Sequence, residues 1–128
     1  MVATVLVVED DPVIIDLLVL TLELEDWSVM KANDAMVALD VARKHHPDVV
    51  VSDVMMPGRS GLDLIGDLAG ATETAGTPVI LLSARALPAE VAAGLAAGAA
   101  DYVTKPFDPD DLVERIRKVL ADRAPGPA

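Results

Sequence analysis

A carboxylate, hydroxyl or ammonium side chain follows four of the five short apolar runs in this sequence. Such runs, bounded by turn residues, are typical of buried parallel strands. The carboxyl ends of parallel strands meet at one edge of a sheet, where ligands bind at the switch point of the strand order. We therefore expect these side chains to converge on one site. They are Glu9 and Asp10 after the first run, Asp53 after the third, Ser83 after the fourth and Lys105 after the fifth.

Three carboxylates in one site need a cation. Two of them about 4 Å apart repel by roughly 4 kcal/mol at an effective dielectric constant of about 20. Hard oxygen donors, with no His or Cys among them, favour Mg²⁺. Lys105 adds a mobile positive charge, and Ser83 adds a hydrogen-bond donor. Together these groups suit the acceptance of a phosphoryl group, which needs alignment and charge neutralisation, with Asp53 as the nucleophile.

The elements that must position these residues follow from the alternation of apolar runs with helical patterns. Five such alternations predict an α/β fold, a doubly wound parallel sheet with helices on both faces. The strand cores are Val5–Val8, Ser28–Lys31, Val49–Ser52, Val79–Leu82 and Tyr102–Thr104. The predicted helices run from Pro12 to about Glu25, from Asn33 or Asp34 to before Pro47, from Ser60 onward, from about Pro88 to Gly98, and from Asp108 to about Asp122. Asp11 should cap the first helix, and Asp63 should complete a capping box with Ser60.

Length and composition limit the classes of protein to which this chain can belong. The chain has 128 residues, 52% of them apolar, which is enough for one globular domain. We expect that domain to span residues 1–122, with 123–128 as a flexible tail or the start of a linker. A net charge of −11, with only one Trp, one Tyr and one Phe, argues against direct binding of nucleic acid. The sequence lacks cysteine, a signal-peptide pattern and a long apolar segment, which predicts a cytoplasmic protein with no membrane span.

Four segments together resemble the receiver domains of two-component response regulators. They are VLVVEDDP, DVVVSDVMMPGRSGLDL, PVILLSA and GAADYVTKPFDPDDL, in the order of that family and over nearly the whole chain. The resemblance implies a flavodoxin-like fold with five strands in the order 2-1-3-4-5. It also implies a regulatory rather than an enzymatic role, with Asp53 phosphorylated by a sensor histidine kinase or a phosphotransfer protein. The implied Mg²⁺ ligands are Glu9, Asp10, Asp53 and the backbone carbonyl of Met55, and the implied switch residues are Ser83 and Tyr102.

Two local features near the site also follow from the resemblance. Met55 and Arg85 hold positions that resemble gates on the water that hydrolyses the acyl phosphate in receivers. Met offers no hydrogen bond to such a water, and Arg can cover the phosphoryl oxygens, so we expect a phosphorylated state that lasts minutes or more. The Lys105–Pro106 peptide bond is expected to be cis.

Two surfaces are predicted to meet partners. The exposed part of the first helix resembles the surface that docks on the four-helix bundle of the kinase, and its predicted residues are Ile14, Ile15 and Leu18. The fourth helix, fifth strand and fifth helix form the predicted output face, where Val91 and Leu95 suit a downstream protein. Most charge pairs that join related receivers into dimers are missing from this face. We therefore expect the unphosphorylated chain to be mainly monomeric.

Two other functions remain open from the residues alone. A Mg²⁺-dependent phosphohydrolase with an aspartyl-phosphate intermediate uses similar chemistry, but usually has a second carboxylate two residues after the nucleophile, where this chain has Met55. A phosphorylation-independent interaction module usually loses an acidic or lysine position of the site, and none is lost here. His45 and His46 are interpreted as a solvated helix end. The chain fits either a single-domain regulator or a receiver taken from a longer protein.

Overall fold

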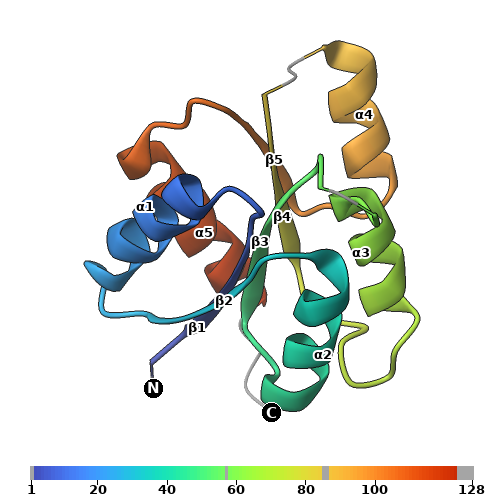
Figure 1. The fold of residues 1–128 in the computed structure, drawn as a ribbon, viewed down its shortest axis with the longest axis horizontal. Helices are drawn as coiled ribbons and strands as arrows, with labels where there is room; N and C mark the ends of the chain where they lie inside the picture. The colour runs from blue at the N-terminus through green and yellow to red at the C-terminus, as the bar shows by residue number, and fades with distance from the viewer. Residues whose placement is uncertain (1, 57, 85–86, 124–128) are drawn as a thin grey trace.

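The computed structural model describes residues 2–56, 58–84 and 87–123, and these form one parallel sheet between two layers of helices (Figure 1). The strand order is β2-β1-β3-β4-β5, which confirms the predicted doubly wound, flavodoxin-like fold. The strands are β1 (Thr4–Val8), β2 (Ser28–Ala32), β3 (Val49–Asp53), β4 (Val79–Ser83) and β5 (Asp101–Thr104). The helices are α1 (Pro12–Glu23), α2 (Ala35–His45), α3 (Gly61–Ala69), α4 (Pro88–Ala96) and α5 (Pro109–Arg123). Every predicted element is therefore present, with small shifts at the ends.

Local capping signals set several helix ends. The side chain of Asp11 accepts a hydrogen bond from the backbone N–H of Val13 at 2.9 Å, which confirms its predicted capping role. Ser60 and Asp63 form the predicted capping box before α3, because each side chain accepts a hydrogen bond from the backbone of the other residue. Helix α2 ends at His45 and is followed by the exposed cap residue His46 with a left-handed φ of 50°, which agrees with the interpretation of the histidines as a solvated helix end.

The three central strands β1, β3 and β4 are buried on both faces, because their side chains alternate between two faces that helices cover. In β1, Val5 and Val7 pack with α1 and α5, whereas Leu6 and Val8 pack on the opposite face with α2 and α3. Figure 1 shows α1 and α5 on one side of the sheet and α2, α3 and α4 on the other. The central strands are therefore the continuous apolar runs that the sequence displays.

Helix α1 corrects one sequence-based prediction. Ile15 and Leu18, predicted to face a kinase, are 8% and 0% exposed and belong to the core together with Leu22, while Ile14 is half-buried. Positions 15, 18 and 22 lie on one helical face, and this face packs on the sheet. The exposed apolar residues of the helix region are Val13, Leu17, Leu20 and Leu24. The helix is apolar on two faces, so its composition alone did not indicate which one is inside.

The last described helix ends close to the predicted domain boundary at residue 122. Helix α5 continues to Arg123, which is the first residue of the predicted tail 123–128, and the rest of that tail, 124–128, lies outside the described residues. Arg85 also lies outside them. Within residues 2–56, 58–84 and 87–123, no helix combines the length and hydropathy needed to cross a membrane.

Candidate functional site

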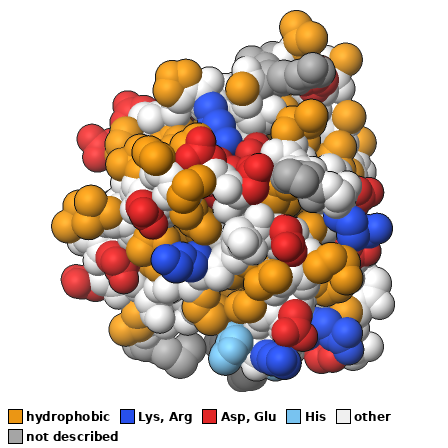
Figure 2. Space-filling view, in the orientation of Figure 1, with side chains coloured by type: hydrophobic (Ala, Val, Ile, Leu, Met, Phe, Trp, Pro, Cys, Tyr) orange, Lys and Arg blue, Asp and Glu red, His pale blue; other side chains and the backbone are white. Residues whose placement is uncertain are grey.

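The parallel strands place the predicted side chains at one edge of the sheet. The register pairs Asp53 with Leu82 and Ser83 with Thr104, so neighbouring strands end at similar levels. The backbone N–H of Lys105 donates to the carbonyl of Ser83 at 2.7 Å, which joins the ends of β4 and β5. Figure 2 shows acidic side chains gathered around a basic group near the top of the molecule, above the carboxyl ends of the strands.

Lys105 joins two of the three carboxylates. Its Nζ lies 2.6 Å from Oε1 of Glu9 and 3.1 Å from Oδ2 of Asp53. Glu9 and Asp53 are 1% and 7% exposed, whereas Asp10 is exposed and donates its backbone N–H to Oε2 of Glu9 at 3.0 Å. The predicted cis bond between Lys105 and Pro106 is present. The four charged groups named from the sequence are therefore brought together as predicted.

Burial dominates the electrostatics of this cluster. The pKa of Glu9 is raised from 4.5 to about 7, chiefly because burial desolvates the carboxylate; the hydrogen bond from Lys105 opposes the rise, and the neighbouring Asp53 adds to it. Burial alone would lower the pKa of Lys105, but its hydrogen bonds to Glu9 and Asp53 outweigh that effect and raise it. Lys105 is therefore a fixed positive charge at neutral pH, and the site holds more carboxylates than one ammonium can neutralise.

The donor set fits a magnesium ion. One oxygen each from Glu9, Asp10 and Asp53 lies within 4.8 Å of the others. These oxygens are hard ligands, and one of the three carboxylates is exposed, which leaves room for the waters that Mg²⁺ retains. Met55 lies beside them, since its backbone N–H donates to Oδ1 of Asp53 at 3.4 Å. The residues present therefore suit Mg²⁺ better than a metal that prefers nitrogen or sulfur.

The predicted switch residues lie beside a small cavity. Ser83 is buried and Tyr102 is half-buried, and both line a cavity of about 160 Å³. Its other lining residues are Val54, Met55, Leu62, Glu90 and Ala93. Of these, Met55 is 63% exposed. Ser83 and Tyr102 are thus close enough to share one space, as their predicted common role requires.

Gly61, which lies near the site, was not predicted from the sequence to have a role there. A Cβ built on Gly61 would lie 2.4 Å from the backbone oxygen of Asp53, a distance that real side chains do not reach. Gly61 also donates its N–H to the carbonyl of Val54 at 2.9 Å. The first turn of α3 therefore approaches the strand that carries Asp53 more closely than any side chain allows. A glycine at the first position of a helix was the available signal.

The fold and the site together define a class of protein. Three carboxylates and a lysine stand at the carboxyl edge of a parallel sheet with strand order 2-1-3-4-5. The family model of the response regulator receiver domain matches residues 5–117, which is most of the chain. This chain belongs to the response regulator receiver domain family.

Individual relatives agree with this assignment. The transcriptional regulatory protein CseB of Streptomyces coelicolor is 46% identical over 116 residues, which are 91% of this chain and 48% of that protein. The transcriptional regulatory protein KdpE of Mycobacterium tuberculosis is 42% identical over 91% of this chain and 50% of that protein. The structure of the chemotaxis response regulator CheY4 of Vibrio cholerae superposes with a TM-score of 0.87 at 31% identity, covering 93% of this chain and 99% of that one. The chain spans about half the length of the curated relatives it matches.

Proposed function

We propose that this chain is the phospho-acceptor of a cytoplasmic two-component system, in which a sensor histidine kinase or a phosphotransfer protein delivers a phosphoryl group to Asp53. The observation that carries the proposal is the position of Lys105, whose Nζ contacts both Asp53 and Glu9. A fixed ammonium beside a buried carboxylate, with further carboxylates able to share a metal, is the charge arrangement that phosphoryl transfer uses. The role is regulatory, because the group that is modified belongs to the chain itself.

The transfer step uses Asp53 as the nucleophile. Its carboxylate oxygen attacks phosphorus in line with the bond to the imidazole nitrogen of the donor. A P–O bond forms, the P–N bond breaks, and its electron pair stays on the imidazole, which takes a proton from water. Lys105 neutralises charge on the phosphoryl oxygens, and the hydroxyl of Ser83 donates a hydrogen bond to them.

A bound Mg²⁺ would be held by Glu9, Asp10, Asp53 and the backbone carbonyl of Met55. When bound, it supplies positive charge that offsets the surplus of carboxylates and of phosphoryl oxygens. The chain has Met55 where a phosphohydrolase usually has its second carboxylate, so no acid at this position assists a leaving group or an attacking water. This absence favours a phospho-acceptor with slow self-hydrolysis over an enzyme with turnover.

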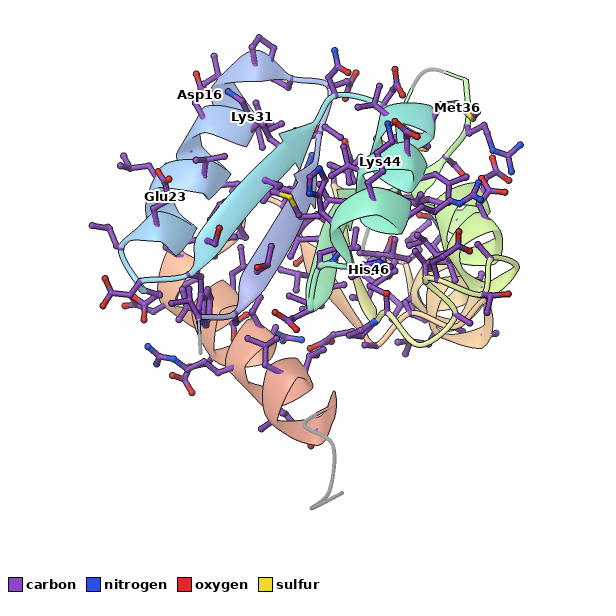
Figure 3. The ribbon with its side chains drawn as sticks, turned by 90° about the horizontal axis from the view of Figure 1, so that it is seen from below. Asp16, Glu23, Lys31, Met36, Lys44 and His46 are labelled. Carbon is purple, nitrogen blue, oxygen red and sulfur yellow. The ribbon has the colours of Figure 1, made fainter. Side chains whose placement is uncertain are left out.

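The outward face of α1 is the proposed docking surface for the kinase, in place of the buried Ile15 and Leu18. Its exposed apolar residues are spaced four, three and four apart, which places them on one helical stripe suited to packing on another helix. They are Val13, Leu17, Leu20 and Leu24. Asp16 and Glu23 lie along this part of the molecule, with Lys31 of β2 near Asp16 (Figure 3). The acidic residues of α1 favour a partner helix with basic residues beside its apolar stripe and disfavour a second copy of this chain.

The output face is proposed to bind a downstream protein. Val91 is half-buried and Leu95 is 46% exposed, so α4 offers apolar surface between small residues. Asp101 and Arg115 could supply one of the charge pairs that join related receivers into dimers, but here they pair within the chain, because Nη1 of Arg115 lies 2.9 Å from Oδ1 of Asp101. This internal pairing supports a heterologous partner and a mainly monomeric unphosphorylated state.

Intact-mass measurement with acetyl phosphate tests the proposal. We expect the mass of one phosphoryl group to be added in the presence of Mg²⁺, to be absent with EDTA, and to decay over minutes or more. Asp53→Asn should abolish the gain, whereas Asp40→Asn, at an exposed position on α2, should keep it. A gain that persists in Asp53→Asn would refute the acceptor assignment. Repeated turnover of acetyl phosphate would instead indicate the phosphohydrolase.

A further inference from the structure

Helix α4 meets the sheet at a glycine. Gly94 is the one buried residue of this helix. A Cβ built on it would lie 2.9 Å from Cδ2 and 3.1 Å from Cε2 of Tyr102, and 3.1 Å from Cδ1 of Leu81. Carbon atoms in favourable contact are about 3.5–4.0 Å apart. The ring of Tyr102 therefore packs on the bare backbone of α4, with no room for a methyl group.

Helix formation does not explain a glycine at this position. Glycine in a helix interior is less stable than alanine, because it loses more backbone freedom on folding. Gly66 in α3 provides the comparison within the same chain, since a Cβ built there meets nothing within 4 Å. Both glycines make their helices less stable than alanine would, but of the two only Gly94 stands where a side chain would collide with its neighbours. Its distinguishing property is the contact with Tyr102 and Leu81.

Tyr102 borders both Gly94 and a cavity. The cavity of about 160 Å³ is lined by Tyr102 and by the α4 residues Glu90 and Ala93, but not by Gly94. We propose that Gly94 is the positioning residue for Tyr102: because it lacks a side chain, the ring rests against α4 beside the cavity. A methyl group at this position would displace the ring into the cavity.

The contact also gives Tyr102 a means of moving α4. The other residues of α4 are half-buried or exposed, so the helix is anchored to the sheet mainly where Gly94 touches Tyr102 and Leu81. In one respect this inference rests on the proposed function, namely that Ser83 and Tyr102 change position when Asp53 is phosphorylated. When the ring leaves Gly94 for the space beside Ser83, α4 loses its close contact with the ring.

Fluorine NMR of the full chain tests the contact directly. Tyr102 is the only tyrosine, so labelling with fluorotyrosine gives one resonance from one known position. In the resting protein, Gly94→Ala should shift this resonance and reduce its broadening by a soluble gadolinium chelate, because the ring becomes more buried. Gly66→Ala should match the wild type. An unchanged resonance in Gly94→Ala, or stronger broadening, would overturn the proposal.

Two further measurements separate the inference from other failures. Mg²⁺ with beryllofluoride should move the wild-type resonance in the direction that Gly94→Ala already shows. A wild-type resonance that does not respond would contradict the proposed switch. The role of Gly94 is still decided by the spectra of the resting proteins. If Gly94→Ala lowers the melting temperature, the same substitution is made in a Tyr102→Ala background. There it should lower the melting temperature much less or raise it, because the ring is gone, alanine favours the helix, and of the three nearest atoms only that of the Leu81 side chain remains close to the added methyl group. An equal loss in both backgrounds would overturn the role assigned to the ring contact.

Discussion

Replacing Glu9 with Gln should change how the stability of this domain depends on pH. Glu9 is 1% exposed, and its burial raises its pKa from the ordinary 4.5 to about 7, with Lys105 opposing the rise and Asp53 adding to it. In the unfolded chain the pKa returns to its ordinary value. The folded state therefore binds the proton more tightly, and stability is lost as the pH rises through this window.

The size of the effect follows from the two pKa values. One pKa unit corresponds to about 1.4 kcal/mol, so the free energy of unfolding should fall by about 3 kcal/mol between about pH 4 and about pH 8 on account of Glu9. Glu9→Gln lacks the titrating group but keeps the shape. Other carboxylates titrate in both proteins, so the difference between wild type and variant isolates the contribution of Glu9.

Urea unfolding followed by the fluorescence of Trp27 measures this difference. Trp27 packs against the core formed by α1, α5 and the sheet, so its signal reports the loss of that core. The titration is run with EDTA, and Glu23→Gln, at an exposed position of α1, serves as the control. Wild type and Glu9→Gln with parallel pH profiles would refute the reasoning. Added Mg²⁺ should reduce the loss at high pH, because a bound cation favours the ionised carboxylate.

Three further predictions test other parts of the structure by substitution. Lys105→Met should lower the free energy of unfolding by about 3 kcal/mol near neutral pH, since it leaves buried carboxylates without their ammonium; equal stability in urea would contradict the ion pairs. Leu18→Ala should cost about 2–5 kcal/mol, whereas Leu17→Ala should stay within roughly 0.5 kcal/mol, and similar losses would disprove the assignment of the buried face. Gly61→Ala should cost about 1–3 kcal/mol, because the added methyl group collides with the backbone oxygen of Asp53; an unchanged melting curve would show that α3 can shift freely.

The sequence by itself determined the order of elements and the composition of the site. Apolar runs and caps are signals carried by neighbouring residues, so Asp11 and the Ser60–Asp63 box could be assigned without knowing what packs against them. Convergence of the strand ends followed from one rule of parallel sheets, which brought Asp53 and Lys105 together from distant positions in the chain.

Only the tertiary structure decided which surfaces are inside and how closely the backbones approach. Helix α1 is apolar on two faces, so the burial of Leu18 and the exposure of Leu17 depend on how the helix is rotated against the sheet. A Cβ built on Gly61 or Gly94 would collide with atoms of the neighbouring strands, whereas one built on Gly66 meets nothing within 4 Å. Burial and close approach are set by contacts between different elements, so the local pattern of one element does not determine them by itself.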